Sequence, residues 1–224
     1  MAKKKDKSYK KLLKEQKLKQ KKLDTIKRTG FILLGILMVV GIFYLISNVT
    51  GSTSYVPSHD DRPFIGPEDA EIVFLEFGCY TCPFTKQFNL QVMNQLIEEY
   101  SDRVRFVYRS VPISRNIGSD LAAMAGKCAN DQDLFWEYSD LLFQTSIYTT
   151  QNLVSLASQL NMNVTVFEEC LSSEKYREEV NQDQREARRA QITMTPTVFI
   201  NEVRINGLHD ISLYRQVLNQ MLSE

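Results

Sequence analysis

The run from Phe31 to Val49 (FILLGILMVVGIFYLISNV) most constrains the fold, because it contains no charged side chain. In an α-helix it spans roughly 28 Å, close to the thickness of the hydrocarbon core of a bilayer. A buried helix of a soluble core is one alternative, but such a helix is rarely apolar on every face. A cleaved signal peptide is the other, but its apolar part is shorter and a small-residue cleavage site follows it. The run therefore predicts an uncleaved transmembrane helix.

Basic charge is concentrated before this run. Residues 1–30 hold 13 Lys or Arg against three acidic residues, although the whole chain has 27 of each and a net charge of zero. Cytoplasmic flanks of membrane helices carry such an excess, so residues from about 50 onward are expected outside the cytoplasm. A nucleic-acid-binding tail is the alternative, but Tyr9 is its only aromatic residue and the rest of the chain is acidic. We therefore expect contact with the lipid bilayer and no nucleic-acid partner.

The remainder begins with a small, polar stretch at residues 50–63, which is typical of a linker. An apolar run at 72–77 predicts a strand that is covered on both faces. Apolar residues at helical spacing predict a helix from Pro83 to about Tyr100, and residues 104–109 predict a second strand. This succession indicates a βαβ unit with parallel strands.

Residues 114–190 read as a set of helices without a β-rich run. The helical stretches are SDLAAMAGKCAN, DLFWEYSDLLF, QNLVSLASQL and the long VTVFEECLSSEKYREEVNQDQREARRAQ. Strand patterns return at 197–200 and 202–205, close enough for a hairpin, and a helix at 208–222 closes the chain. The predicted fold class is α/β, with a helical insertion in a β-α-β…β-β-α domain that covers residues 64–224.

The motif Cys79-Tyr80-Thr81-Cys82 lies between a predicted strand and a predicted helix. A zinc site would need two further ligands, and the remaining cysteines and the two histidines are scattered, so no metal is expected. An inert disulfide is a second alternative. Thiols at a helix N-terminus, however, face free N–H groups and the positive end of the helix dipole, which stabilise a thiolate nucleophile. The motif therefore indicates thiol–disulfide chemistry.

From Phe64 onward the chain resembles the thioredoxin superfamily, and more closely its DsbA-like thiol–disulfide oxidoreductases. The resemblance rests on PEDAEIVFLEF, CPF, KCANDQDLFWEYSDLLF and MTPTVFIN. It implies a thioredoxin-like fold, disulfide exchange without an organic cofactor, and a cis-proline loop at Thr195-Pro196 whose backbone pairs with a bound polypeptide. An ordinary trans-proline before an edge strand is the alternative for Pro196.

The position of the cysteines departs from the family pattern. The usual partner of the nucleophile would stand at Thr85, whereas here Cys79 lies three residues before Cys82. Either cysteine can be the attacking thiol. Pro83 favours Cys82, because proline is preferred at the first helical position and makes the preceding residue the N-cap. We expect Cys82 to have the lower pKa, and Tyr80 and Thr81 to contact the substrate.

Three further residues receive roles through the resemblance. Glu76 occupies the place of a buried acidic residue that could assist proton transfer, with a solvent-facing glutamate as the alternative. The local C-x-x-C pair leaves Cys128 and Cys170 for each other, and relatives imply the same structural disulfide. Two buried free thiols are the alternative there.

The sequence therefore predicts a single-pass membrane protein whose outer domain exchanges disulfides with secreted or membrane polypeptides, with a membrane redox partner as a further expectation. The direction of exchange stays open. A non-catalytic thioredoxin-fold subunit that holds substrate for a membrane complex is the main alternative, and Thr85 in place of cysteine supports it. Copper delivery by the cysteine pair is a weaker one, because few Met or His residues lie near the motif.

Overall fold

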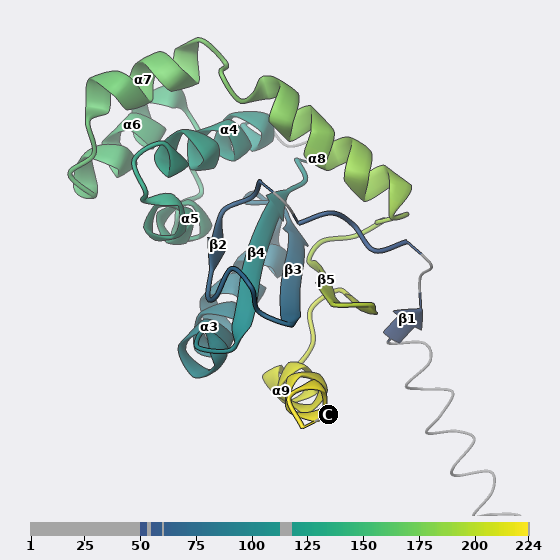
Figure 1. Ribbon diagram of the computed structural model, residues 1–224. Coiled ribbons are helices and arrows are strands. Elements are labelled where there is room, and N and C mark those ends of the chain that lie inside the picture. The colour runs from purple at the N-terminus through teal and green to yellow at the C-terminus, as the bar shows by residue number, and fades with distance from the viewer. Residues whose placement is uncertain (1–49, 53–54, 60, 113–117, 224) are drawn as a thin grey trace, which may run out of the picture. The chain divides into compact units, whose positions relative to one another are not determined.

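A mixed β-sheet lies at the centre of the domain (Figure 1). The computed structural model describes residues 50–52, 55–59, 61–112 and 118–223. The predicted transmembrane helix at 31–49 lies outside these residues. Within the described ranges, no helix is both long enough and apolar enough to cross a bilayer.

The sheet has the strand order β1-β6-β5-β3-β4-β2. Its strands are β1 (Thr50–Ser52), β2 (Phe64–Ile65), β3 (Ile72–Gly78), β4 (Val104–Ser110), β5 (Thr197–Ile200) and β6 (Val203–Asn206). β3 and β4 are parallel, with Glu76 opposite Tyr108, and β5 pairs antiparallel with β3. The predicted βαβ unit and the β5–β6 hairpin are confirmed, and the two short edge strands were not predicted.

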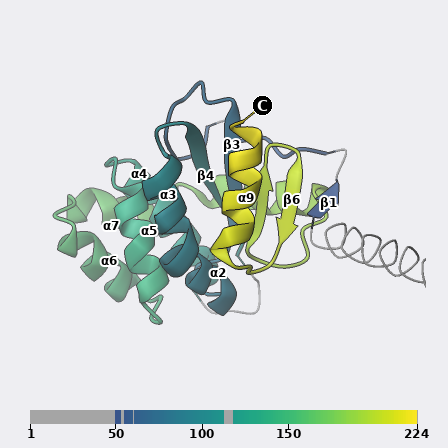
Figure 2. The same ribbon diagram turned by 90° about the horizontal axis from the view of Figure 1, so that it is seen from below.

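Helices α2 (Pro83–Phe88), α3 (Asn94–Tyr100) and α9 (Ile211–Met221) cover one face of the sheet (Figure 2). Between α2 and α3 the helix widens into a π-helical segment, η1 (Asn89–Met93). The predicted helix from Pro83 to Tyr100 is therefore continuous but contains one irregular turn. Apolar side chains from these helices, including Phe88, Leu96 and Tyr214, form a core against Phe74 and Phe106.

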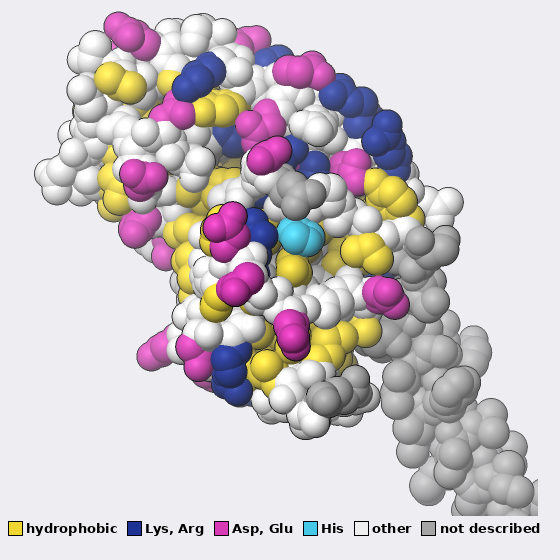
Figure 3. Space-filling view, viewed as in Figure 1, with side chains coloured by type: hydrophobic (Ala, Val, Ile, Leu, Met, Phe, Trp, Pro, Cys, Tyr) yellow, Lys and Arg dark blue, Asp and Glu magenta, His cyan; other side chains and the backbone are white. Residues whose placement is uncertain are grey.

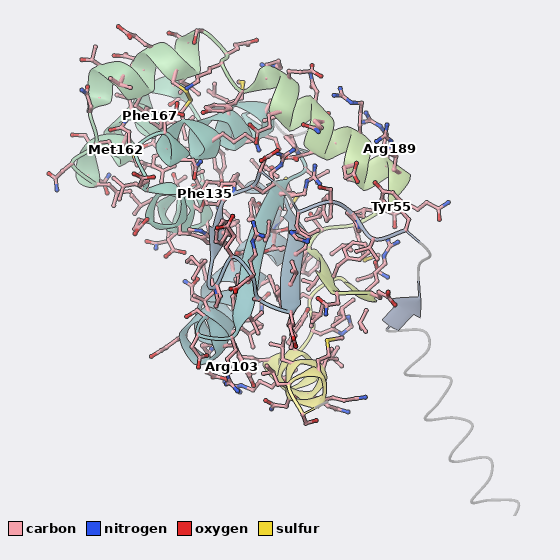
Figure 4. All side chains as sticks on the ribbon, in the orientation of Figure 1. Tyr55, Arg103, Phe135, Met162, Phe167 and Arg189 are labelled. Atoms are coloured by element: carbon pink, nitrogen blue, oxygen red, sulfur yellow. A yellow bond between two sulfur atoms is a disulfide. The ribbon has the colours of Figure 1, made fainter. Side chains whose placement is uncertain are left out.

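Four helices of the insertion form a second core beside the sheet (Figure 1). They are α4 (Ser119–Asn130), α5 (Phe135–Gln144), α6 (Thr150–Gln159) and α7 (Val164–Ser172). Phe135, Met162 and Phe167 lie in this insertion (Figure 4) and belong to its core. A disulfide joins Cys128 of α4 to Cys170 of α7, with a Cα–Cα distance of 5.9 Å. The disulfide ties two helices that are 42 residues apart in the chain.

The long helix expected at the end of the insertion is instead two helices, α7 and α8 (Arg177–Arg189). Glu174 has a φ of 53°, and the amides of Glu174 and Lys175 donate to the carbonyls of Leu171 and Cys170. This is a Schellman motif, which ends a helix and usually has glycine at the left-handed position. The sequence carries glutamate there, so the break was missed.

Helix α8 covers part of the other face of the sheet. Its Ala187 and Ala190 pack against Leu75, Phe77 and Phe199. Acidic residues occupy its first turn and Arg188 and Arg189 its last, an arrangement that the helix dipole favours. Lys and Arg side chains gather along this helix in Figure 3.

The segment 50–63, expected to be a linker, belongs to the domain wherever it is described. β1 pairs with β6, Pro57 is buried, and the Tyr55 hydroxyl donates to the Glu186 carboxylate. Tyr55 lies next to Arg189 at the end of α8 (Figure 4). The compact unit therefore starts at Thr50 rather than at Phe64.

A buried ionic cluster holds this segment, β4, α4 and α8 together. The fully buried Asp183 carboxylate lies 2.9 Å from each of Arg62 Nε, Arg109 Nε and Lys127 Nζ. Glu179 contributes a second acidic group, 2.6 Å from Lys127. Buried charges are tolerated only when paired in this way, so the cluster makes the contact between these four elements specific.

Candidate active site

The C-x-x-C motif occupies the turn between β3 and α2. β3 ends at Gly78, and the Cys82 amide donates to the Cys79 carbonyl at 3.0 Å. A side chain at Gly78 would approach the Tyr108 hydroxyl to 2.7 Å and Glu76 Oε1 to 2.8 Å. Only glycine fits at this point, so the turn begins directly above the buried Glu76 and Tyr108.

Cys82 is the N-cap of α2. Its backbone is extended, Pro83 follows in the first turn, and the Lys86 amide donates to the Cys82 carbonyl at 3.0 Å. Cys82 is 7% exposed. The Thr195–Pro196 peptide bond is cis, and the Thr195 hydroxyl lies close enough to Cys82 to lower the pKa of its thiol, without completing a hydrogen bond of good geometry.

Cys79 lies deeper, with no exposed surface. Its sulfur is 3.2 Å from the Thr81 hydroxyl and 3.5 Å from the Ser119 hydroxyl at the start of α4. Hydrogen bonding from the Cys82 thiol, supported by these two hydroxyls, lowers the pKa of Cys79 to about 5. The thiol pair therefore shares one proton when Cys79 is ionised.

The expectation that Cys82 has the more acidic thiol stays a prediction, although this geometry lowers the pKa of Cys79. The hydrogen bond of Cys82 to Cys79 and its burial raise the pKa of Cys82. The expectation rested on the position of Cys82 at the N-terminus of α2. The hydroxyl groups of Thr81 and Ser119, however, lie close to the sulfur of Cys79. Which cysteine attacks a substrate stays a prediction, since a low pKa and an accessible sulfur fall on different residues.

Thr85 occupies the position where relatives have the second cysteine, and it is fully buried. Its hydroxyl accepts a hydrogen bond of 3.5 Å from the Cys79 amide. The Thr85 side chain in α2 therefore binds the backbone of Cys79 in the turn.

Tyr80, expected to contact the substrate, is 1% exposed and points into the insertion. Its hydroxyl lies 2.8 Å from Ser139 Oγ, and its ring packs against Tyr108 and Phe143. The tyrosine at this position cannot reach a substrate and instead anchors the turn to the helices. Thr81 remains half-buried at the surface of the turn.

Glu76 is fully buried, so the alternative of a solvent-facing glutamate is excluded. Asn89 Nδ2 donates to Glu76 Oε1 at 2.9 Å, while Oε2 has no partner among the described residues. Burial raises the pKa of Glu76 to about 8, although the bond from Asn89 opposes this. The carboxyl group is therefore largely protonated at neutral pH.

Three residues at the site were not found from the sequence. Ser119 and Asn89 have been described, and Tyr148, after α5, donates a hydrogen bond of 2.8 Å to the Tyr80 carbonyl. Ser119 lies 40 residues from Cys79 in the chain, and Tyr148 lies 68 residues from Tyr80. No local sequence pattern connects either residue to the motif. In the described part of the chain, no group of three or more His, Cys, Asp or Glu residues could hold a metal ion.

Comparison with known proteins gives consistent matches. A sequence model of the family described as thioredoxin matches residues 58–220. Disulfide bond formation protein D of Bacillus subtilis strain 168 is 28% identical over 177 residues, which cover 74% of this chain and 79% of that protein. The crystal structure of oxidised BdbD from Bacillus subtilis has a TM-score of 0.70 at 26% identity and covers 77% of this chain and 99% of that one. Wolbachia pipientis α-DsbA1 shares the fold, with a TM-score of 0.66 at 20% identity, covering 74% and 92%.

Proposed function

Since the chain belongs to the thioredoxin family and is a thiol–disulfide oxidoreductase of the DsbA type, we propose that it is anchored in the membrane and exchanges disulfides with extracytoplasmic polypeptides through Cys79 and Cys82. One observation carries the proposal for the site. Two thiols share one turn, and the more exposed of them lies next to the cis-Pro196 loop.

Cys82 is the attacking thiol in this proposal, because Cys79 has no exposed surface. When Cys82 attacks a substrate disulfide, its sulfur bonds to one substrate sulfur and the other leaves as a thiolate. The proton of Cys82 passes to Cys79, and from there to the departing sulfur. The Cys79 thiolate then attacks Cys82, forms the internal disulfide and releases the second substrate sulfur. The reverse sequence oxidises a substrate dithiol and returns the pair to its reduced form.

The oxidising direction is the one that we propose. A thiolate held at a pKa of about 5 stabilises the reduced pair, and a stable reduced form makes the disulfide a stronger oxidant. Protonated Glu76 lies in the core beneath the turn, where a buried carboxyl group can give or accept a proton as the thiols change charge.

A polypeptide is the substrate class that the surface supports. Phe84, two residues after Cys82, is 64% exposed, and Met194, immediately before Thr195, is 52% exposed. Ile147, which is 56% exposed, precedes Tyr148, the residue that holds the Tyr80 carbonyl. Exposed apolar side chains around a reactive thiol suit the apolar residues of an unfolded chain. Anchoring rests on the apolar run 31–49 and on the basic residues 1–30.

Two assays on the full-length protein in detergent or nanodiscs test the proposal. One follows oxidation of reduced, unfolded ribonuclease and the other follows reduction of insulin, each against a Cys82→Ser variant. We expect the oxidised protein to restore ribonuclease activity and Cys82→Ser to be inactive. Equal rates for the two proteins would favour the alternative of a non-catalytic substrate-binding subunit, for which Thr85 in place of cysteine is the supporting observation.

Protease added outside intact cells tests the topology. We expect it to remove the domain while a tag at Ala2 stays protected. A protected domain would contradict the extracytoplasmic assignment, whatever the result of the activity assays.

A further inference from the structure

The start of α4, in the helical insertion, lies beside the thiol pair. Ser119 is the first residue of this 12-residue helix and is 3% exposed. Its hydroxyl lies 3.5 Å from Cys79 Sγ and 3.4 Å from Thr81 Oγ1. Cys82 is therefore the N-cap of α2, whereas the sulfur of Cys79 lies beside the side chain of the first residue of α4.

The position of Ser119 is fixed by its surroundings. Gly118 has a φ of 83°, and a side chain there would approach Cβ of Tyr148 to 2.6 Å and the Tyr148 carbonyl oxygen to 2.8 Å. The same Tyr148 donates to the Tyr80 carbonyl at 2.8 Å. The start of α4 therefore packs against Tyr148, the residue that holds the cysteine turn, and this packing places the Ser119 hydroxyl beside Cys79.

We propose that Ser119 is a positioning residue for disulfide exchange, which holds the Cys79 sulfur as a thiolate in the reduced protein and directs it toward Cys82. The inference rests on the proposed function. Cys79 lies in the turn before α2, and the first residue of α4 supplies a hydroxyl donor that stabilises a thiolate there.

The contact between Ser119 and Cys79 also orients the attack of Cys79 on Cys82, which completes the exchange. In the mixed disulfide, Cys82 is bonded to the substrate, and Cys79 loses the thiol that donates to it. Thr81 and Ser119 then remain as donors to the Cys79 thiolate. Its electron pair forms the bond to Cys82, and the substrate sulfur leaves with the electrons of the broken bond. Titratable groups near the turn include Tyr108, Tyr148 and the buried Glu76. Burial raises the pKa of all three, so they stay protonated while Cys79 ionises.

Thiolate absorbance against pH tests the inference, in full-length protein with Cys82→Ser, where Cys79 is the one free thiol. We expect Ser119→Ala to raise the apparent pKa of Cys79 by about one, a tenfold weaker acid. Ser119→Thr should retain the low value. Ser119→Val, which has the shape of threonine without the hydroxyl, should match Ser119→Ala. An unchanged pKa in both Ser119→Ala and Ser119→Val would overturn the inference.

The equilibrium with glutathione gives a second readout, with both active-site cysteines present. Ser119→Ala should shift the equilibrium constant about tenfold toward a less oxidising pair, which is about 30 mV for two electrons. Ser139→Ala is the control, because it removes a buried hydroxyl of the insertion that bonds to Tyr80 rather than to Cys79. A shift of equal size in Ser139→Ala would overturn the inference. If wild type fails to oxidise substrate but Ser119 still sets the pKa, the proposed function fails and this inference stands.

Discussion

The Asn89 side chain joins the buried Glu76 to the active-site helix. Its Nδ2 donates to Glu76 Oε1 at 2.9 Å and to the Thr85 carbonyl at 3.0 Å. Asn89 begins the π-helical segment, and such widened turns free a backbone carbonyl for a side-chain partner. A single residue therefore connects the carboxyl group beneath the cysteines to the first turn of α2.

Glu76→Gln should remove most of the pH dependence of stability between pH 4.5 and 8. The folded-state pKa of about 8 exceeds the ordinary glutamate pKa of 4.5. Folding therefore favours the protonated form, and stability is full below pH 4.5 and is lost as the pH rises through 8. A pKa difference of this size lowers the free energy of unfolding by roughly 5 kcal/mol above pH 8. Urea denaturation at a series of pH values measures it.

Glu71→Gln is the matched control, because Glu71 is exposed and should leave the profile unchanged. A wild-type protein that is no less stable at pH 9 than at pH 5, or a Glu76→Gln profile parallel to that of wild type, would contradict a neutral buried carboxyl group.

The elements that the sequence predicts well are those with a strong periodic pattern. β3, β4 and α4 coincide with the predicted ranges within about a residue, because their apolar residues bury against both cores. β1 and β2 were missed, since three and two residues are too few for a period to show. Tertiary pairing with β6 and β4 creates them.

For the site, the C-x-x-C motif located the two cysteines and the resemblance located the cis-proline loop, but the distribution of charge between the thiols could not be predicted. Ser119 lies 40 residues from Cys79 in the chain, and no local pattern points to it. Tyr80 was expected to contact the substrate. Its ring packs instead against Tyr108 and Phe143, a tertiary contact that the local sequence does not show.

Replacing both Cys128 and Cys170 by alanine should destabilise the domain by about 4 kcal/mol, the chain-entropy value for a loop of 42 residues. Urea denaturation of the full-length protein measures the loss. Mild reductant should open the Cys79–Cys82 disulfide first, because the low pKa of Cys79 stabilises the reduced form of that pair. Native alkylation of Cys128 or Cys170 before the C-x-x-C pair would show that the disulfide is not the protected structural one.

Asp183→Asn should cost about 3–5 kcal/mol of stability, because three buried cations lose their shared partner. Asp102→Asn provides the comparison, since its pair with Arg103 is exposed and should be worth less than about 1 kcal/mol. Denaturant midpoints of the two variants measure both losses of stability. Similar small losses in both would mean that the cluster does not hold the segment at Arg62 to α8.

Phe84→Ser should lower kcat/KM for reduced ribonuclease by about fivefold, close to 1 kcal/mol of apolar contact with the bound chain. Oxidation of glutathione should be unchanged, because so small a thiol does not extend past the cysteines. Val166→Ser, an exposed apolar residue of α7, is the control. Equal losses on both substrates would place Phe84 in the chemistry of the thiols rather than in polypeptide binding.

Trapping of mixed disulfides in the full-length protein tests the central claim most directly. The account predicts that Cys79→Ser accumulates a covalent complex with a scrambled polypeptide that carries disulfides, linked through Cys82, because the second thiol that would release it is absent. Cys82→Ser should accumulate no complex, because Cys79 has no exposed surface. Complexes linked through Cys79 in Cys82→Ser, with none through Cys82 in Cys79→Ser, would contradict the assignment of Cys82 as the attacking thiol.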